Sequence, residues 1–448
     1  MTGGWIFRRV AFLAGCCLAA SSCAHNTALP LPERPALGTS VQALRHAGVS
    51  LSAPLRIDEV ATLAVQNNPE LAATRAQHGV AQAQLMQAGM PPNPQVNGSL
   101  LPLVAGPATT LAYNAGMSID VKALITLTDR RDAARASGRQ IDAQILWQEW
   151  QTVGQARLLV VDLIEGERNR QILTATRDLL AGRSARSQRA LAAGNATIAT
   201  VTPDLVALQA ARAQVFVAEQ VLLAKRHQLN ALLGLAPDVA LPLAGRPDLP
   251  AVDAEHVLPL LPSLADRRPD LVALRLGYAA EDAKLRGAIL AQFPNLAFGV
   301  AGGSDNSNIR NVGPQITLEL PIFDRNQGNI AIERATRRQL RDEYAARLAA
   351  TDGQVRAMLT EMAQLERQLD AARADLAASK RVTDQADAAY AAGNLDERGY
   401  VDLVSARLAK EQEIVALEQS LLEQRVAIAT LIGAGMRPIA LPAEKPRT

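Results

Sequence analysis

Few side chains in this sequence could carry out chemistry. Its three cysteines stand near the N-terminus, so the rest of the chain offers no disulfide, thiolate metal site or thiol nucleophile. The five histidines are scattered and none stands at metal-ligand spacing from another: His25, His46, His78, His227 and His256. We find no glycine-rich phosphate loop, nucleophile elbow or His-Glu metal motif. We therefore expect no enzyme and no metal site.

Two pairs of methionines stand at helical spacing. Met86 with Met90 and Met358 with Met362 could present thioethers to a soft metal ion. Methionine is also a common filler of irregular gaps in hydrophobic cores. We interpret both pairs as core packing.

The N-terminus has the pattern of an export signal. Two arginines precede an apolar run at residues 10–20, too short to span a bilayer, which needs ~20 residues. Small residues before Cys23 resemble a bacterial lipobox, which predicts a signal peptide at 1–22 and a covalent lipid on Cys23. Cys16 fits the box better but leaves too short an apolar run, and cleavage without lipidation is a further alternative. Residues 23–50 would then be a lipid-anchored, extended segment.

Charge and composition exclude one partner and favour one architecture. Lys and Arg number 46 against 44 Asp and Glu, so the net charge of +2 gives no reason to expect nucleic acid. Aromatic residues are only 3% of the chain, which argues against a thick globular core. The abundance of Ala, Leu, Arg and Gln favours long helices packed through small side chains.

The sequence contains an internal duplication. Asn67–Leu71 is matched 200 positions later by Arg267–Leu271, and Ala192–Asn195 is matched 199 positions later by Ala391–Asn394. Apolar residues at coiled-coil spacing also repeat at the offset of 199. They are Val215, Ala218, Leu222, Leu229 and Leu232 in the first copy, with Ile414, Leu417, Leu421, Ile428 and Leu431 in the second. We place the repeats at 51–245 and 246–436, with a tail at 437–448.

Each copy predicts a helix, two strands, a long helix, a turn and a second helix. Asn68 can cap the first helix with Pro69 at its first position, and Pro94 and Pro294 should stop the equivalent helices. The proline-free runs at about 124–192 and 330–391 would each form a helix about 100 Å long at 1.5 Å per residue. Such lengths indicate antiparallel coiled-coil hairpins rather than helices around one core. The hairpins should turn near 194 and 393, where Gly and Asn tolerate positive φ.

The predicted strands carry a two-faced pattern. Apolar and polar residues alternate over about 94–104, 109–121, 295–303 and 311–322. This length suits a tilted membrane-crossing strand, although a half-buried soluble sheet remains an alternative. Four strands per chain cannot close a barrel, and open edges are not tolerated in hydrocarbon. Three chains would supply twelve strands around a water-filled lumen.

From about Ile57 to Gly433 the sequence resembles the TolC-like outer membrane factor family. The resemblance is carried by the paired Asn-Asn-Pro-Glu-Leu and Arg-Pro-Asp-Leu motifs, by Leu320–Asp324, and by Tyr390–Gly393 with Asp402 nine residues on. It implies a mainly α fold with a small transmembrane β-barrel. Long hairpins would form an α-helical tunnel, and four strands per chain would contribute to a 12-stranded trimeric barrel. The implied partners are a homotrimer, a periplasmic adaptor, an inner-membrane RND-type transporter and outer-membrane lipid.

The resemblance also implies roles for individual residues. Asp402, and Asp204 near the equivalent site of the first copy, would form the pore constriction. The hairpin tips at Gly194, Asn195, Gly393 and Asn394 would dock the adaptor, and Pro321 with Phe323 would form the barrel-to-helix junction. The first copy departs from the junction pattern and has Val121-Lys122-Ala123-Leu124 there.

The expected function is an outer-membrane exit duct of a tripartite efflux system for small molecules or metal cations, lipid-anchored and extending into the periplasm. Phe323–Asn329 is similar to the heavy-metal efflux branch of the family. Two alternatives stay open: the duct of a type I protein secretion system, and a soluble periplasmic coiled-coil scaffold. Beyond the covalent lipid we expect no cofactor.

Overall fold

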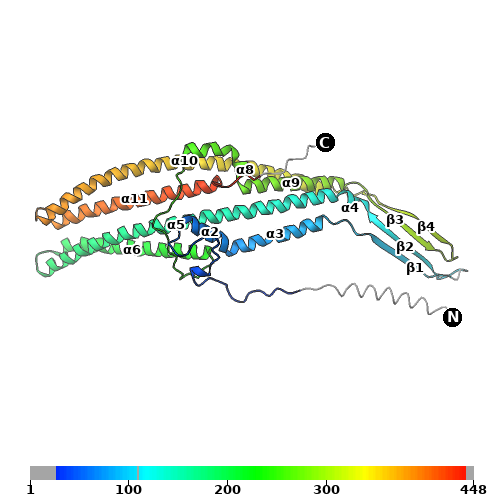
Figure 1. Ribbon diagram of the computed structural model, residues 1–448, viewed down its shortest axis with the longest axis horizontal. Helices are drawn as coiled ribbons and strands as arrows, with labels where there is room; N and C mark the ends of the chain where they lie inside the picture. The colour runs from blue at the N-terminus through cyan, green and yellow to red at the C-terminus, as the bar shows by residue number, and fades with distance from the viewer. Residues whose placement is uncertain (1–26, 108–109, 440–448) are drawn as a thin grey trace. The chain divides into compact units, whose positions relative to one another are not determined.

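The structure is a computed structural model that describes residues 27–107 and 110–439 (Figure 1). Residues 27–37 belong to a unit of their own and carry no helix or strand. All elements below belong to the second unit, which begins at Gly38. The predicted signal peptide at 1–22, Cys16 and the predicted lipidation site Cys23 lie outside the described residues, as does most of the predicted tail.

Both repeats follow the predicted order of elements. After the short η2 (Val41–Ala43), the first repeat contains α2 (Ile57–Asn67), α3 (Pro69–Ala88), β1 (Gln95–Leu101), β2 (Ala112–Asp120), α4 (Val121–Ile125), α5 (Leu127–Ala192) and α6 (Ile198–Leu232). The second contains α7 (Ala254–Val257), η3 (Leu258–Ser263), α8 (Leu264–Arg267), α9 (Pro269–Leu290), β3 (Asn295–Ser304), β4 (Arg310–Glu319), α10 (Gln327–Ala391) and α11 (Glu397–Leu431). The mainly helical fold class with a four-stranded antiparallel sheet is confirmed.

The helix α3 begins as predicted but ends earlier. The Asn68 side chain accepts a hydrogen bond from the Leu71 amide at 2.9 Å, with Pro69 in the first turn. The last helical residue is Ala88, so the prediction that Pro94 ends this helix is wrong. The residue before a proline avoids the helical region, and Pro91 already imposes this on Met90. Helix α9 also ends earlier than predicted. Its last residue is Leu290, whereas Pro294 should have let the helix continue to Phe293.

The two corners between strand and long helix differ, as their sequences do. In the first repeat Asp120 ends β2 and directly caps α4, accepting from the Ala123 amide at 2.9 Å. The long helix predicted from about 124 begins at Leu127 instead, because Thr126 separates α4 from α5. In the second repeat residues 320–326 separate β4 from α10, and Asn326 enters the helix with φ of 59°. Within residues 27–107 and 110–439, none of the helices combines the length and the apolar composition that a bilayer span requires.

The hairpins α5–α6 and α10–α11 turn at equivalent glycines. Gly194 has φ of 77° and Gly393 has φ of 76°, values that favour glycine. The Asn195 amide donates to the Ala190 carbonyl and the Asn394 amide to the Ala389 carbonyl, both at 2.8 Å, as in a Schellman helix end. Figure 1 shows both turns at one end of this unit and the sheet at the other.

Helix α5 connects the two repeats. It packs against α6 of its own repeat and against α9 and α11 of the other. At one close approach the Trp150 indole donates to the Thr430 carbonyl at 3.0 Å. A Cβ at Gly154 would lie 2.6 Å from the Thr430 hydroxyl, so only glycine lets α11 approach α5 this closely. Separate hydrophobic cores lie where each hairpin base meets the short helices of its repeat.

Candidate functional site

The sheet has one polar face and one apolar face. Its order is β1-β2-β3-β4, and directly paired residues share a face. One face is mainly apolar, with Gly98 and Gly302 within it and the pair Ser304 and Arg310 at one end: Val96, Leu100, Tyr113, Ala115, Met117, Ile119, Leu296, Phe298, Val300, Val312, Pro314, Ile316 and Leu318. Apart from Leu101, the other face is polar or small: Gln95, Asn97, Ser99, Asn114, Gly116, Ser118, Asp120, Asn295, Ala297, Gly299, Ala301, Gly303, Asn311, Gly313, Gln315, Thr317 and Glu319.

The apolar face is uncovered in the single chain. Val312 is 80% exposed, Val96 79% and Ile316 65%. A contiguous apolar surface of this kind marks contact with lipid or another protein. Strands β1 and β4 each pair on one side only within the described residues, so both edges offer free backbone donors and acceptors. The sheet therefore suits the wall of a barrel completed by other chains, with its polar face toward water.

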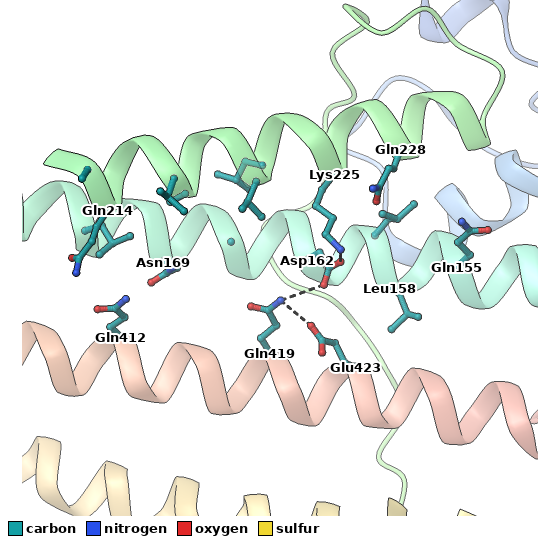
Figure 2. A pocket seen from close by; sticks show the side chains of 18 residues that line it. Gln155, Leu158, Asp162, Asn169, Gln214, Lys225, Gln228, Gln412, Gln419 and Glu423 are labelled. Atoms are coloured by element: carbon teal, nitrogen blue, oxygen red, sulfur yellow. Dashed lines mark hydrogen bonds and ion pairs between the residues drawn. The ribbon is translucent and has the colours of Figure 1, made fainter. Parts of the chain in front are cut away.

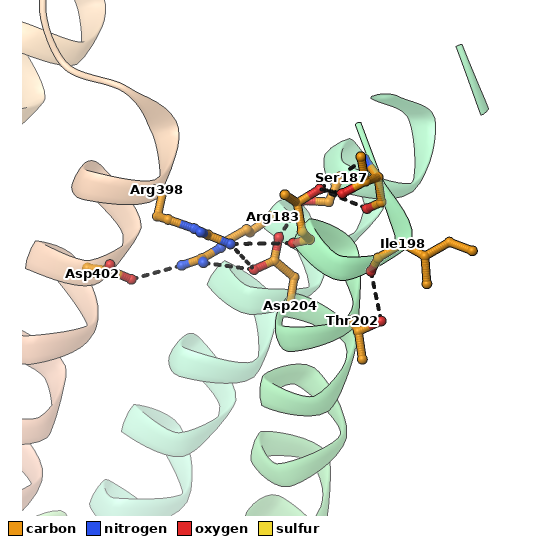
Figure 3. A network of polar contacts seen from close by, with 9 residues as sticks. Arg183, Ser187, Ile198, Thr202, Asp204, Arg398 and Asp402 are labelled. Carbon is orange, nitrogen blue, oxygen red and sulfur yellow. Dashed lines mark hydrogen bonds and ion pairs between the residues drawn. The ribbon is translucent and has the colours of Figure 1, made fainter. Parts of the chain in front are cut away.

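At the opposite end, Arg183 on α5 joins the two predicted constriction acids (Figure 3). One guanidinium nitrogen lies 2.7 Å from Asp204 on α6, and the other lies 2.8 Å from Asp402 on α11. The Arg183 side chain is only 13% exposed. The structure thus brings Asp204 and Asp402 to one arginine, which ties the tip of the first hairpin to that of the second.

The two acids differ in environment. The Asp204 side chain is 4% exposed, accepts a hydrogen bond from Ser187 and lies 3.5 Å from Arg398, whereas the Asp402 side chain is 65% exposed. Burial disfavours the charged form of Asp204, but the hydrogen bonds from Ser187 and Arg183 outweigh it and hold the pKa of this carboxyl below its ordinary value. Asp204 is therefore an ionised acid with its charge compensated, and Asp402 is the acid open to solvent.

Further contacts lie close to this network. Arg186 on α5 forms an ion pair with Glu397 at the start of α11, again between the two hairpins. Within the second hairpin the rings of Tyr390 and Tyr400 stack with centroids 4.6 Å apart. A hydrogen bond with Asp387 raises the pKa of the Tyr400 hydroxyl. Sequence reasoning missed Arg183 and Arg186, because no spacing distinguishes them from the other arginines of α5.

The predicted docking turns are exposed. Gly194, Asn195, Gly393 and Asn394 all lie at the surface, and a Cβ at either glycine would meet open space. At the predicted junction Phe323 is 94% exposed, while Pro321 is partly buried. The following turn is held to α9, since the Asn326 side-chain amide donates to the Ala288 carbonyl at 2.8 Å.

The two methionine pairs differ in burial. Met362 is buried in the core of the second hairpin and Met358 packs against that core, so core packing is correct for this pair. The prediction of core packing is wrong for the first pair, because the Met86 side chain is 67% exposed and that of Met90 is 47% exposed. Among the described residues no group of three or more His, Cys, Asp and Glu side chains could hold a metal ion.

A cavity of about 860 Å³ lies between α5, α6 and α11 (Figure 2). Four of its polar groups form a network: Lys225 pairs with Asp162 at 2.7 Å, and Gln419 donates to Asp162 at 3.2 Å and to Glu423 at 2.8 Å. Burial raises the pKa of Glu423. This arrangement joins α11 to the first hairpin and offers no reactive group.

Comparison with known proteins supports the resemblance seen in the motifs. Residues 260–434 match the outer membrane efflux protein family. The chain is 26% identical over 297 residues to the cobalt-zinc-cadmium resistance protein CzcC of Cupriavidus metallidurans, covering 65% of this chain and 69% of CzcC. The resemblance to TolC-like outer membrane factors is confirmed.

Solved structures show the same fold. CusC, whose transmembrane channel formation has been described, superposes with a TM-score of 0.66 at 18% identity, over 92% of this chain and 100% of CusC. The outer membrane protein VceC of Vibrio cholerae superposes with a TM-score of 0.68 at 15% identity, over 85% of this chain and 97% of VceC. At these identities the likeness concerns the fold.

Proposed function

We propose that this chain, whose second repeat matches the outer membrane efflux proteins, is the channel subunit of a tripartite efflux system in the outer membrane of a Gram-negative bacterium. It acts as a passive duct and catalyses no reaction. The observation that carries the proposal is the sheet with one apolar face, one polar face and two unpaired edges. Such a sheet is stable in hydrocarbon only where other chains pair with its edges.

The assembly is a homotrimer. Two chains would supply eight strands, whose inward side chains nearly fill a barrel, whereas three supply twelve and leave a water-filled lumen. The polar face then lines that lumen with amides and hydroxyls, and the apolar face meets lipid. A covalent lipid on Cys23 would anchor the N-terminus in the same membrane.

The hairpin tips form the periplasmic entrance. The exposed glycine turns at Gly194 and Gly393 leave room for a periplasmic adaptor to pack closely, and the adaptor connects the duct to an inner-membrane RND-type transporter that supplies the energy. Asp402 contributes a carboxylate to the constriction, where a ring of carboxylates favours cations. Asp204 acts there through Arg183, because its own charge is buried and paired.

The cargo is a metal cation. The support is the similarity to CzcC, a cobalt-zinc-cadmium resistance protein, together with the absence of a basic residue from the polar face of the four strands. A passive duct needs no metal site of its own.

Extraction and conductance test the proposal. The full-length protein should remain in membranes after carbonate and salt washes, need detergent for extraction, run at the mass of three chains and conduct ions in planar bilayers. Release by carbonate as a monomer without conductance would identify a soluble scaffold instead. A deletion strain should become sensitive to cobalt, zinc or cadmium; loss of a secreted protein with unchanged metal tolerance would point to a type I secretion duct.

A further inference from the structure

The internal duplication predicts which helices meet between neighbouring copies. Within one chain α5 of the first repeat packs against α11 of the second. The equivalents of these helices are α10 and α6, which match α5 and α11 at the offset of 199 that relates Gly194 to Gly393. Each repeat therefore has one helix that can make this contact on either side: α5 and α6 in the first repeat, α10 and α11 in the second. Within one chain only α5 and α11 meet, so α10 and α6 are left for contacts with other copies. The open edges at β1 and β4 require the row of repeats to continue into a second copy.

We infer that the contact of α10 with α6 of the neighbouring copy is ionic in its middle and uncharged at its tip. The inference rests on the proposed trimer. We call the α5–α11 contact the internal seam and the α10–α6 contact the external seam. The position of each residue in the external seam follows from its equivalent in the internal seam.

In the middle of the helices the two seams share their chemistry. Arg168 on α5 bonds to Glu165 one turn back at 2.5 Å and to Glu418 on α11 at 2.9 Å. Their equivalents at the offset of 199 are Arg367, Gln364 and Glu219. Arg367 already bonds to Gln364 at 2.5 Å, and Glu219 is exposed on α6. The external seam therefore pairs Arg367 with Glu219 of the neighbouring copy.

A pair of glycines gives the same register. Gly154 on α5 meets Thr430 of α11 so closely that a Cβ would clash at 2.6 Å, whereas a Cβ at Gly353, its equivalent on α10, would meet nothing within 4 Å. The equivalent of Thr430 is Ala231 on α6. In the assembly, Ala231 of the neighbouring copy would cover Gly353.

At the tips the chemistry of the two seams diverges. The internal seam is held by Arg183 with Asp402 and by Arg186 with Glu397. The equivalents are Val382 with Pro203 and Gln385 with Ile198, and none of these four carries a charge. Val382 is 47% and Ile198 73% exposed. In Figure 3, Ile198 projects from the side of α6 that faces away from Arg398 and Asp402, as a contact with another copy requires.

The entrance of the trimer therefore alternates three ionic seams with three uncharged ones. Ion pairs near a surface weaken as salt rises, but contacts between aliphatic side chains do not. At the tips, salt should thus weaken the solvent-accessible pairs Arg186–Glu397 and Arg183–Asp402 inside each chain more than the uncharged contact between chains.

Cross-linking tests the external seam. The variant Gln385→Cys with Ile198→Cys, in the full-length protein in detergent, should convert most of the monomer band into covalent dimers and trimers with a short bis-maleimide. The matched control is Arg186→Cys with Glu397→Cys, the same positions of the internal seam, which should link within one chain and stay at monomer mass. Single-cysteine variants report any contribution of Cys23.

Charge reversal tests the middle of the seam. Arg367→Glu and Glu219→Arg should each lower the share of trimer that survives mild SDS several-fold, and the double variant should restore most of it. A native trimer whose 385–198 pair stays monomeric, or a double reversal no better than its parents, would overturn the inference while the proposed channel stands. A protein without any trimer or conductance would instead refute the proposed function.

Discussion

Asn68 and Arg268 occupy the same place in the two repeats and reach equivalent carbonyls with different side chains. The Asn68 amide donates to the Leu232 carbonyl at 3.0 Å, and the Arg268 guanidinium donates to the Leu431 carbonyl at 3.2 Å. Both carbonyls lie at the ends of the returning hairpin helices, α6 and α11. The repeated Asn-Pro-Glu-Leu and Arg-Pro-Asp-Leu motifs therefore join the start of a short helix to the end of a hairpin.

Replacing Arg268 should destabilise the protein more than replacing Asn68. Arg268 is 4% exposed, bonds to both oxygens of the buried Asp270 at 2.9 and 2.7 Å, and lies over the Trp147 ring at 4.7 Å. Arg268→Ala removes both close bonds to the buried Asp270 and leaves it only the longer contact with Arg347 at 3.9 Å, and breaking a buried ion pair typically costs about 3–5 kcal/mol. Asn68→Ala loses a helix cap worth about 1–2 kcal/mol. Thermal unfolding followed by circular dichroism should rank the variants in this order; equal losses would contradict the buried ion pair.

A glycine-to-alanine pair on α5 tests the close approach to α11. Gly154→Ala places a methyl group against Thr430 and should destabilise the protein by about 1–3 kcal/mol. Gly138→Ala on the same helix meets nothing within 4 Å and should be neutral or stabilise it by about 0.5–1 kcal/mol. The same unfolding measurement applies, and a stabilising Gly154→Ala would show that α11 can yield.

The stability should fall near neutral pH because of Glu333 on α10. Its hydrogen bond with Glu281 on α9 raises the pKa of Glu333 to about 7. A carboxyl with a raised pKa binds its proton more tightly in the folded protein, so this stabilisation is full below the ordinary pKa of 4.5 and is lost as pH rises from there to about 7. Glu333→Gln should flatten the dependence of the melting temperature on pH between about 4.5 and 7. Glu343→Gln on the same helix is the control and should leave the dependence unchanged.

Arg183 should control the width of the entrance. Arg183→Gln removes both ion pairs that join α5 to Asp204 and Asp402, and should raise single-channel conductance in planar bilayers. Arg177→Gln is the control, because Arg177 pairs with Asp178 on its own helix and makes no ion pair with another helix among the described residues. Equal conductance of the two variants would exclude Arg183 from the constriction.

The two constriction acids should give different phenotypes. Asp402→Asn removes a solvent-open charge and should lower the preference for cations, measured as reversal potential in a salt gradient, with little loss of stability. Asp204→Asn leaves the buried Arg183 and the half-exposed Arg398 less compensated, and should lower the melting temperature more than the selectivity. Unchanged reversal potential in Asp402→Asn would remove it from the constriction.

Much of the fold was predictable because it depends on local patterns. The turn glycines, the cap at Asn68 and the strand alternation each involve residues within a few positions of one another. Because the sequence is duplicated, the turn and strand patterns could be read in both repeats. The early end of α3 is also a local effect, since Pro91 disfavours a helical conformation at Met90. The prediction missed it because it assigned the helix end to Pro94. The break at Thr126 was missed because the short helix α4 follows β2 directly, with Asp120 as both the last residue of the strand and the cap of the helix.

The sequence by itself determined that the chain is a duplicated pair of hairpins with two-faced strands, since periodicity and turn chemistry act along the chain. Only the tertiary structure decided which residues meet at the entrance. Arg183 and Asp402 are 219 positions apart, and their contact depends on the relative register of α5 and α11. That register is set by the close packing of Gly154 against Thr430, a contact between helices that no periodicity encodes.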